Sequence, residues 1–96
     1  MIETTPRHRL YIQVCEHVKP GVQSCGAVGA PLREQLKARV AALGLAKEIR
    51  VMKSGCFGVC EEGPNVFLFP HGVWFHHVGV QDLEDILQRA RSLAGV

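Results

Sequence analysis

The sequence lacks any apolar run long enough to cross a membrane. None of its stretches approaches the roughly 18 consecutive apolar residues that a membrane helix needs. Its first ten residues, MIETTPRHRL, also lack the apolar core of a secretory signal peptide. We therefore expect a cytoplasmic protein that does not bind membranes.

The sequence also has few charged residues and little net charge. Only 21% of the residues are charged, and the formal net charge is +2. Proteins that bind nucleic acids present a concentrated basic face, whereas the basic residues here are dispersed along the chain. We therefore expect no nucleic-acid partner. With 96 residues, 47% of them hydrophobic, the chain has enough apolar material for one small domain with a modest core.

The first half of the sequence predicts a strand, a long loop and a helix. Apolar and polar residues alternate over residues 8–15, which is the period of a strand. Residues 16–30 are rich in glycine and read as a loop. A helix is expected to begin at Pro31 and to end at Gly44, with Leu45 completing the hydrophobic contact of a glycine cap.

The second half predicts a strand, a hairpin and a helix. Residues 47–53 form the strand, and the apolar segments 65–69 and 72–78 flank a Pro-His-Gly turn that predicts a hairpin. An amphipathic helix is expected over residues 82–93, with acidic residues in its first turn.

The order β-α-β followed by β-β-α predicts an α/β fold, with a four-stranded mixed sheet and helices mainly on one face. We expect residues 1–8 to form a flexible tail and residues 9–96 to form the domain. A β-α-β unit pairs its strands in parallel, so Cys15 and Cys56 should both lie just past the carboxyl ends of neighbouring strands. Open α/β sheets bind their ligands at this edge.

Four cysteines, Cys15, Cys25, Cys56 and Cys60, are separated by 9, 30 and 3 intervening residues. Structural disulfides would need an oxidising compartment, to which nothing in the sequence points. Structural zinc sites prefer closely spaced pairs, and a redox dithiol prefers C-x-x-C at the start of a helix. The segment CEH at 15–17 matches half of a Rieske site, but the second histidine is absent. All-cysteine ligation of a [2Fe–2S] cluster fits best, with zinc and disulfides as the alternatives.

The cysteine pattern and the segment GCFGVCEEGPNVFLFPHGVWFHHV, residues 55–78, resemble the thioredoxin-like [2Fe–2S] ferredoxins. The small cluster-bearing subunit of NADH dehydrogenase is similar to the same family. The most specific part is the C-x3-C pair followed by Gly-Pro, an apolar strand, a Pro-x-Gly turn and an aromatic strand. The resemblance covers residues 9–93, nearly the whole chain.

The resemblance implies a thioredoxin-like fold and one [2Fe–2S] cluster per chain. It implies that Cys15 and Cys25 hold one iron and that Cys56 and Cys60 hold the other. The implied function is one-electron transfer between unidentified redox proteins, without catalysis by the chain. Two alternatives are an accessory or regulatory subunit docked on a larger redox enzyme, and a thiol-disulfide oxidoreductase that uses Cys56 and Cys60.

Residues near the cysteines have predicted roles around the cluster. Three glycines let the backbone approach the sulfurs, and three apolar residues are candidates to exclude water. Glu61 and Glu62 are possible docking charges. The glycines are Gly26, Gly55 and Gly58, and the apolar residues are Val22, Phe57 and Val59. The basic residues Arg33, Lys37 and Lys53 are possible docking charges as well.

The sheet face away from the helices should carry aromatic side chains, methionine and arginine, with few carboxylates. Such a composition is typical of an interface core, and the resembled family implies dimers, so we expect a homodimer. The residues expected on this face include Tyr11, Gln13, Arg50, Met52, Phe67 and Trp74. No histidine is assigned a role. His76 and His77 are expected to be adjacent in a strand and to point to opposite faces. His8, His17 and His71 are expected in exposed segments.

Overall fold

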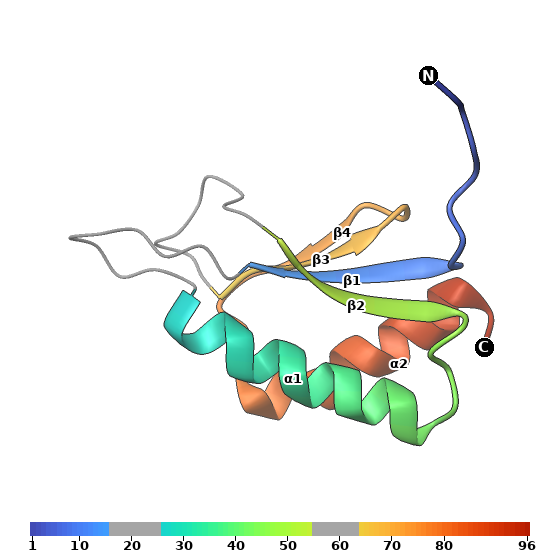
Figure 1. The fold of residues 1–96 in the computed structure, drawn as a ribbon. Coiled ribbons are helices and arrows are strands. Elements are labelled where there is room, and N and C mark those ends of the chain that lie inside the picture. Colours follow the sequence, from blue (N-terminus) through green and yellow to red (C-terminus); the bar gives the residue numbers. More distant parts are fainter. Residues whose placement is uncertain (16–25, 55–63) are drawn as a thin grey trace.

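A computed structural model describes residues 1–15, 26–54 and 64–96, with the backbone alone for residues 26–28 (Figure 1). The elements in chain order are β1 (Leu10–Cys15), α1 (Gly26–Ala42), β2 (Ile49–Ser54), β3 (Val66–Phe69), β4 (Val73–Phe75), the 3₁₀ turn η2 (Val80–Asp82) and α2 (Leu83–Ala94).

The four strands form one mixed sheet in the order β2-β1-β3-β4. β1 pairs with β2 in parallel, and it pairs with β3 in the antiparallel sense. The hairpin β3–β4 completes the sheet. Both helices cover the same face (Figure 1). The predicted β-α-β and β-β-α order, and the placement of the helices, are therefore confirmed.

The core lies between the sheet and the two helices. Alternate residues of β1, Leu10, Ile12 and Val14, are fully buried on the helix side, as the two-residue period of a strand requires. Leu36 of α1 and Ile86 of α2 approach them from the other layer, with 0% and 2% of their surface exposed. This apolar layer is what fixes the face on which each strand residue lies.

Helix α1 begins five residues earlier than predicted. The sequence predicted a start at Pro31, but the helix starts at Gly26 and contains Pro31 within its second turn. A proline lacks the N–H that an interior helical residue donates, which made it look like a first residue. The loss of one hydrogen bond does not stop the helix, and the preceding segment includes two alanines, the best helix former.

The predicted end of α1 is confirmed. Gly44 takes a left-handed φ of 71°, which costs glycine little. The Leu45 N–H donates to the carbonyl of Val40 at 3.1 Å, and the Gly44 N–H donates to Ala41 at 3.0 Å. These two bonds form a Schellman cap. Leu45 then packs against the core, which directs the chain into β2.

The predicted hairpin is confirmed, but its second strand is shorter than expected. β4 ends at Phe75, and the prediction that it reaches residue 78 is wrong. His77 adopts a positive φ of 53°, which turns the chain out of the sheet. The Val78 N–H then donates to the carbonyl of Pro64 at 3.1 Å, and the Val78 side chain is buried in the core.

Helix α2 has the predicted polarity. Glu84 and Asp85 lie in its first turn and Arg91 in its last, where they complement the helix dipole. The two helices are joined on their outer side by an ion pair between Arg39 Nη1 and Glu84 Oε2 at 2.7 Å. Among the described residues, no helix is both long and apolar enough to cross a bilayer.

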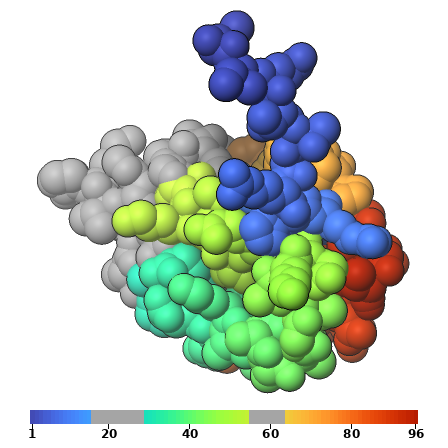
Figure 2. All heavy atoms as spheres, turned by 45° about the vertical axis from the view of Figure 1, so that its right-hand side comes forward, coloured from blue at the N-terminus to red at the C-terminus, as the bar shows by residue number. Residues whose placement is uncertain are grey.

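In the ranges that the structure describes, no helix covers the sheet face away from α1 and α2. We call it the open face and define it by the residues of the four strands that project there. Its groove of about 370 Å³ is bordered by Tyr11, Met52 and Phe69 and by residues of the N-terminal segment. That segment projects from the body of the molecule (Figure 2). The open face comprises Tyr11, Gln13, Arg50, Met52, Phe67, Phe69 and Trp74, and the terminal residues Cys15 and Ser54 lie on the same side by register.

The residues of the N-terminal segment lie outside helices and strands, and residues 1–7 are exposed. His8 is half-buried rather than exposed, because its ring contacts the edge of Tyr11 with the ring centroids 5.3 Å apart. Regular pairing begins at Arg9, whose N–H donates to the carbonyl of Glu48 at 2.8 Å. The flexibility of residues 1–8 stays a prediction.

Replacing Leu36 by alanine should lower the free energy of unfolding by about 2–5 kcal/mol, because its fully buried side chain would leave a cavity between helix and sheet. Leu43→Ala is the matched control. Leu43 is 47% exposed just beyond the same helix, and its loss should cost less than about 1 kcal/mol. Urea unfolding followed by circular dichroism measures both values. Equal losses in the two variants would contradict the described core.

Candidate metal centre

The parallel pairing of β1 and β2 brings two chain segments to one edge of the sheet. Cys15 is the last residue of β1 and is in register with Ser54, the last residue of β2. Cys56 follows Ser54 by two positions, and Cys25 directly precedes the first residue of α1. The start of α1 lies at the same end of the molecule as the carboxyl ends of both strands (Figure 1).

Cys15 is held inside the sheet. Its side chain has no exposed surface. Its backbone N–H donates to the carbonyl of Asn65 at 3.1 Å, which extends the antiparallel ladder of β1 and β3 by one residue beyond the pair Val14 and Val66. The main chain at Cys15 is thereby fixed by β2 on one side and by the residue before β3 on the other.

Asn65 is the one buried residue of polar type in the part of the chain that the structure describes, with 1% of its surface exposed. A buried amide is costly unless it is hydrogen-bonded. Its Oδ1 accepts a hydrogen bond from the indole Nε1–H of Trp74 at 3.1 Å. Asn65 therefore contacts Cys15 through its main chain and Trp74 through its side chain.

The sequence placed Asn65 only as the first residue of an apolar strand and gave it no role. A single asparagine after Gly63 and Pro64 has the composition of a turn. The signal that would have helped is its position opposite Cys15, which depends on the register of β1 and β3. That register joins segments about fifty residues apart, and local patterns do not fix it.

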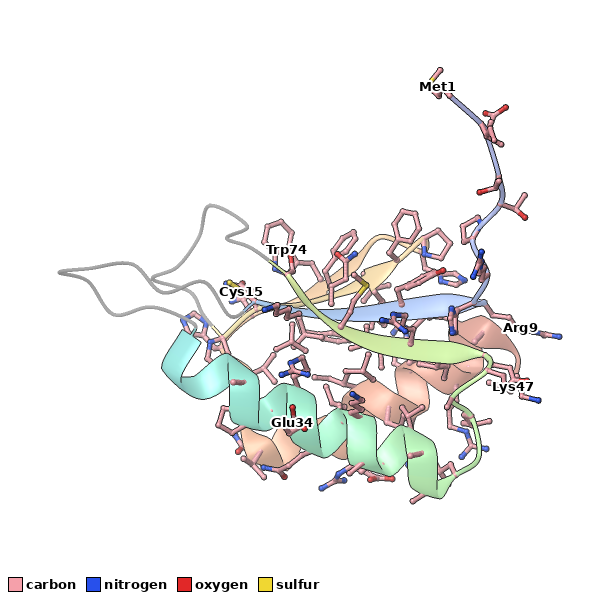
Figure 3. All side chains as sticks on the ribbon, viewed as in Figure 1. Met1, Arg9, Cys15, Glu34, Lys47 and Trp74 are labelled. Atoms are coloured by element: carbon pink, nitrogen blue, oxygen red, sulfur yellow. The ribbon has the colours of Figure 1, made fainter. Side chains whose placement is uncertain are left out.

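Trp74 lies on the open face, at the end of the sheet that carries Cys15 (Figure 3). It pairs with Phe67 across the β3–β4 ladder, and the two rings meet edge to face with centroids 6.3 Å apart. The indole is 45% exposed. One edge of the ring thus reaches the buried amide while part of the ring is in contact with solvent.

The charge at this edge favours an anionic group. The start of a helix carries a partial positive charge, because its first N–H groups have no partner within the helix. Lys53, which precedes the last residue of β2, is an exposed cation, whereas Lys37 lies eleven residues after the start of α1 and therefore away from this edge. Arg33 is engaged with its neighbour, with Nη2 3.0 Å from Glu34 Oε1. Thiolate sulfurs bound to a metal would be stabilised by such surroundings.

Three of the four predicted ligands, Cys25, Cys56 and Cys60, lie outside the described residues. The predicted loop residues around them also lie outside, namely His17, Val22, Gly55, Phe57, Gly58, Val59, Glu61 and Glu62. Their predicted roles stay predictions. In the described ranges, no group of three metal-ligating side chains comes together, and Cys15 is the predicted ligand whose position the structure describes.

The prediction for His76 and His77 is wrong in its geometry. These residues follow β4 instead of lying in it, and the positive φ of His77 turns both rings to one side. Their Nδ1 atoms are 2.9 Å apart, a distance at which one ring donates to the other. His71, by contrast, is exposed in the hairpin turn as predicted.

The residues present fit a sulfur-ligated iron group. Iron–sulfur clusters are held by cysteine thiolates, and their properties depend on backbone N–H groups and on exclusion of water. The buried sulfur of Cys15 lies at the edge of the sheet where β2 ends, at the same end of the molecule as the start of α1. In the sequence, Cys25 directly precedes α1, and Cys56 and Cys60 follow the last residue of β2 by two and six positions.

Comparison with known proteins supports this interpretation. The family model of the thioredoxin-like [2Fe-2S] ferredoxins matches residues 1–91. A 2Fe-2S ferredoxin of Clostridium pasteurianum is 43% identical over 44 residues, which is 46% of this chain and 43% of that protein. A 2Fe-2S ferredoxin of Aquifex aeolicus is 33% identical over 39 residues, covering 41% of this chain and 35% of the relative. The matched stretches thus span less than half of the length of these relatives.

Solved structures show the same fold. The wild-type thioredoxin-like [2Fe-2S] ferredoxin of Aquifex aeolicus superimposes with a TM-score of 0.76 at 24% identity, over 92% of this chain and 88% of the other. A cysteine-to-serine variant of that ferredoxin gives a TM-score of 0.70 at 25% identity, over 83% and 84% of the two chains. With the match to the family model, the sheet topology and the position of Cys15, we conclude that the chain belongs to the thioredoxin-like [2Fe-2S] ferredoxin family.

Proposed function

We propose that this protein is a one-electron carrier that holds one [2Fe–2S] cluster through Cys15, Cys25, Cys56 and Cys60. One observation carries the proposal. Cys15 is fully buried at the carboxyl end of β1, in register with the end of β2, at the same end of the molecule as the start of α1. Membership of the ferredoxin family supports an electron-transfer iron–sulfur protein.

In this proposal Cys15 and Cys25 bind one iron, and Cys56 and Cys60 bind the other. The cluster accepts and releases a single electron, which is the chemistry that it supplies when bound. The chain contributes thiolates, a site partly closed to water and a surface on which redox partners dock. No acid–base or nucleophilic side chain is required, so we propose a carrier and not an enzyme.

Charge neutralisation bears on how partners are recognised. A [2Fe–2S] group with four thiolates has a formal charge of about −2 when oxidised. The chain with neutral thiols has a formal charge of +2, so the loaded protein would be close to neutral. Long-range steering by net charge would then be weak, and partners would recognise a local patch. We propose the cytoplasm as its location, because a reducing compartment keeps ligand thiols available.

We also propose that two copies of the chain associate through their open faces. The strands place Tyr11, Phe67, Phe69 and Trp74 on this face, and its residues include no carboxylate. A second copy is the occupant that we favour, because pairing identical apolar faces about a two-fold axis removes both of them from water at once. The single basic residue of the face, Arg50, is exposed and lies on the outer strand β2, where it can stay at the rim.

Protein purified without oxygen should be red-brown and contain about two irons per chain, because four thiolates bind a [2Fe–2S] group. Absorption spectroscopy and iron analysis measure this directly. After reduction by dithionite, low-temperature electron paramagnetic resonance should show a spin-half signal. A colourless protein that resists iron–sulfur reconstitution and holds zinc would contradict the proposal. Reduction of insulin by a colourless protein would instead indicate a thiol-disulfide oxidoreductase.

Cys15→Ala should abolish the visible absorption of a stable cluster, because alanine cannot replace a buried thiolate ligand. Ser54→Ala is the matched control, since Ser54 occupies the same register position on β2 and is not a proposed ligand. That variant should retain its iron and its spectrum. Full retention of iron in Cys15→Ala would exclude Cys15 from the ligand set.

Phe69→Lys should convert the dimer into a monomer, because it places a charge within the paired open faces. Phe69 is 41% exposed on the open face. Leu43→Lys, at a residue that is 47% exposed near the end of α1, is the control and should leave the dimer intact. Sedimentation velocity at micromolar concentration distinguishes the two states. A monomeric wild-type protein would refute the homodimer.

A further inference from the structure

We infer that Asn65 is a positioning residue for the Cys15 end of the cluster site, and that Trp74 holds Asn65 in place from the open face. This inference rests on the proposed function, because it assumes that Cys15 is a cluster ligand. It adds a residue to which the cysteine pattern gives no role. Its basis is the hydrogen-bonded connection from Cys15 to Asn65 and from Asn65 to Trp74.

The first link fixes the backbone of Cys15. The Cys15 N–H donates to the Asn65 carbonyl at 3.1 Å, and this bond comes after the last register pair of β1 and β3, Val14 with Val66. It holds the final residue of β1 on the side away from β2. The position of the Cys15 Cα, and with it the direction of the sulfur, therefore depends on where Asn65 lies.

The second link fixes Asn65. Its side chain is 1% exposed, and its Oδ1 accepts from Trp74 Nε1 at 3.1 Å. Trp74 is itself oriented by its cross-strand pair with Phe67 and by the edge-to-face contact of the two rings. Removing the Trp74 N–H takes this donor from the buried Oδ1, and the loss of a hydrogen bond to a buried polar atom costs about 1–3 kcal/mol of stability.

Packing alone would be served better by an apolar residue. An isosteric leucine would fill the space of Asn65 without the cost of burying an amide. Asparagine at this site therefore indicates that its side chain fixes the position of the backbone at residue 65, where it pairs with Cys15. A cluster whose ligand is held in this way should keep a defined sulfur geometry, and its reduction potential depends on that geometry and on nearby hydrogen bonds.

The experiment uses the complete cluster-loaded protein with Asn65→Ala, Asn65→Leu, Trp74→Phe and the control Leu43→Ala. Trp74→Phe keeps an aromatic ring on the open face but removes the indole N–H. Leu43 is 47% exposed just beyond the C-terminal end of α1, outside the open face and remote from the start of the helix. Trp74→Phe and both Asn65 variants should lose the cluster to an iron chelator about tenfold faster than wild type, which corresponds to ~1.4 kcal/mol. The same variants should shift the reduction potential and the g values of the reduced protein, and Leu43→Ala should shift neither.

Hydrogen exchange supplies a readout that does not depend on the cluster. Mass spectrometry of the peptide that contains Cys15 should show faster exchange in Trp74→Phe and in the Asn65 variants, and unchanged exchange in Leu43→Ala. Wild-type rates and potentials in Trp74→Phe and Asn65→Leu, with unchanged exchange, would overturn the inference. A wild-type protein without any cluster would refute the proposed function, and unchanged exchange would then still refute the link between Asn65 and Cys15.

Discussion

The parallel pairing of β1 with β2 is the constraint on which the rest of the structure depends. Parallel strands cannot be joined by a tight turn, so the chain must cross over the sheet, and α1 makes this crossing. As a result, both strands point the same way and end at the same edge. Cys15 ends one strand, and the segment leading to Cys56 leaves the other. An antiparallel pair would have sent these two segments to opposite edges of the sheet.

The apolar layer between sheet and helices determines which face of the sheet each residue of β1 occupies. Leu10, Ile12 and Val14 fix one face of β1 against the helices, and the two-residue period of the strand then fixes Tyr11, Gln13 and Cys15 on the other side. The open face and the buried cysteine are therefore consequences of the same packing. Asn65 lies where the two meet, because its carbonyl completes the pairing of β1 and its amide reaches Trp74.

The sequence predicted most of the fold because its signals were local. Alternation in β1, the glycine cap after α1 and the Pro-x-Gly hairpin each depend on a few neighbouring residues, and each is found as predicted. The errors arose where a local rule met a tertiary constraint. Pro31 is accommodated within a helix that begins at Gly26. β4 ends at Phe75, and the turn at His77 directs the chain to the buried Val78. At the cysteine edge, Cys15 is found at the predicted end of β1, and its role as a ligand stays a prediction. The contact of Asn65 with Cys15 was missed, since it follows from a register between distant segments.

The backbone of Cys15 is held on both sides, by β2 and by Asn65, and this rigidity suits electron transfer. A group that exchanges single electrons works best when its ligands do not rearrange between the two charge states, which requires a preorganised site. Cys15 satisfies this condition more fully than a loop cysteine would, because β2 holds one side of its strand and Asn65 holds the other. The amide of Asn65 is held in turn by an indole that is half in solvent. A contact made on the open face at Trp74 is thus two hydrogen bonds away from the backbone of a proposed ligand, and covering that face would act on the geometry of the centre without touching the cluster.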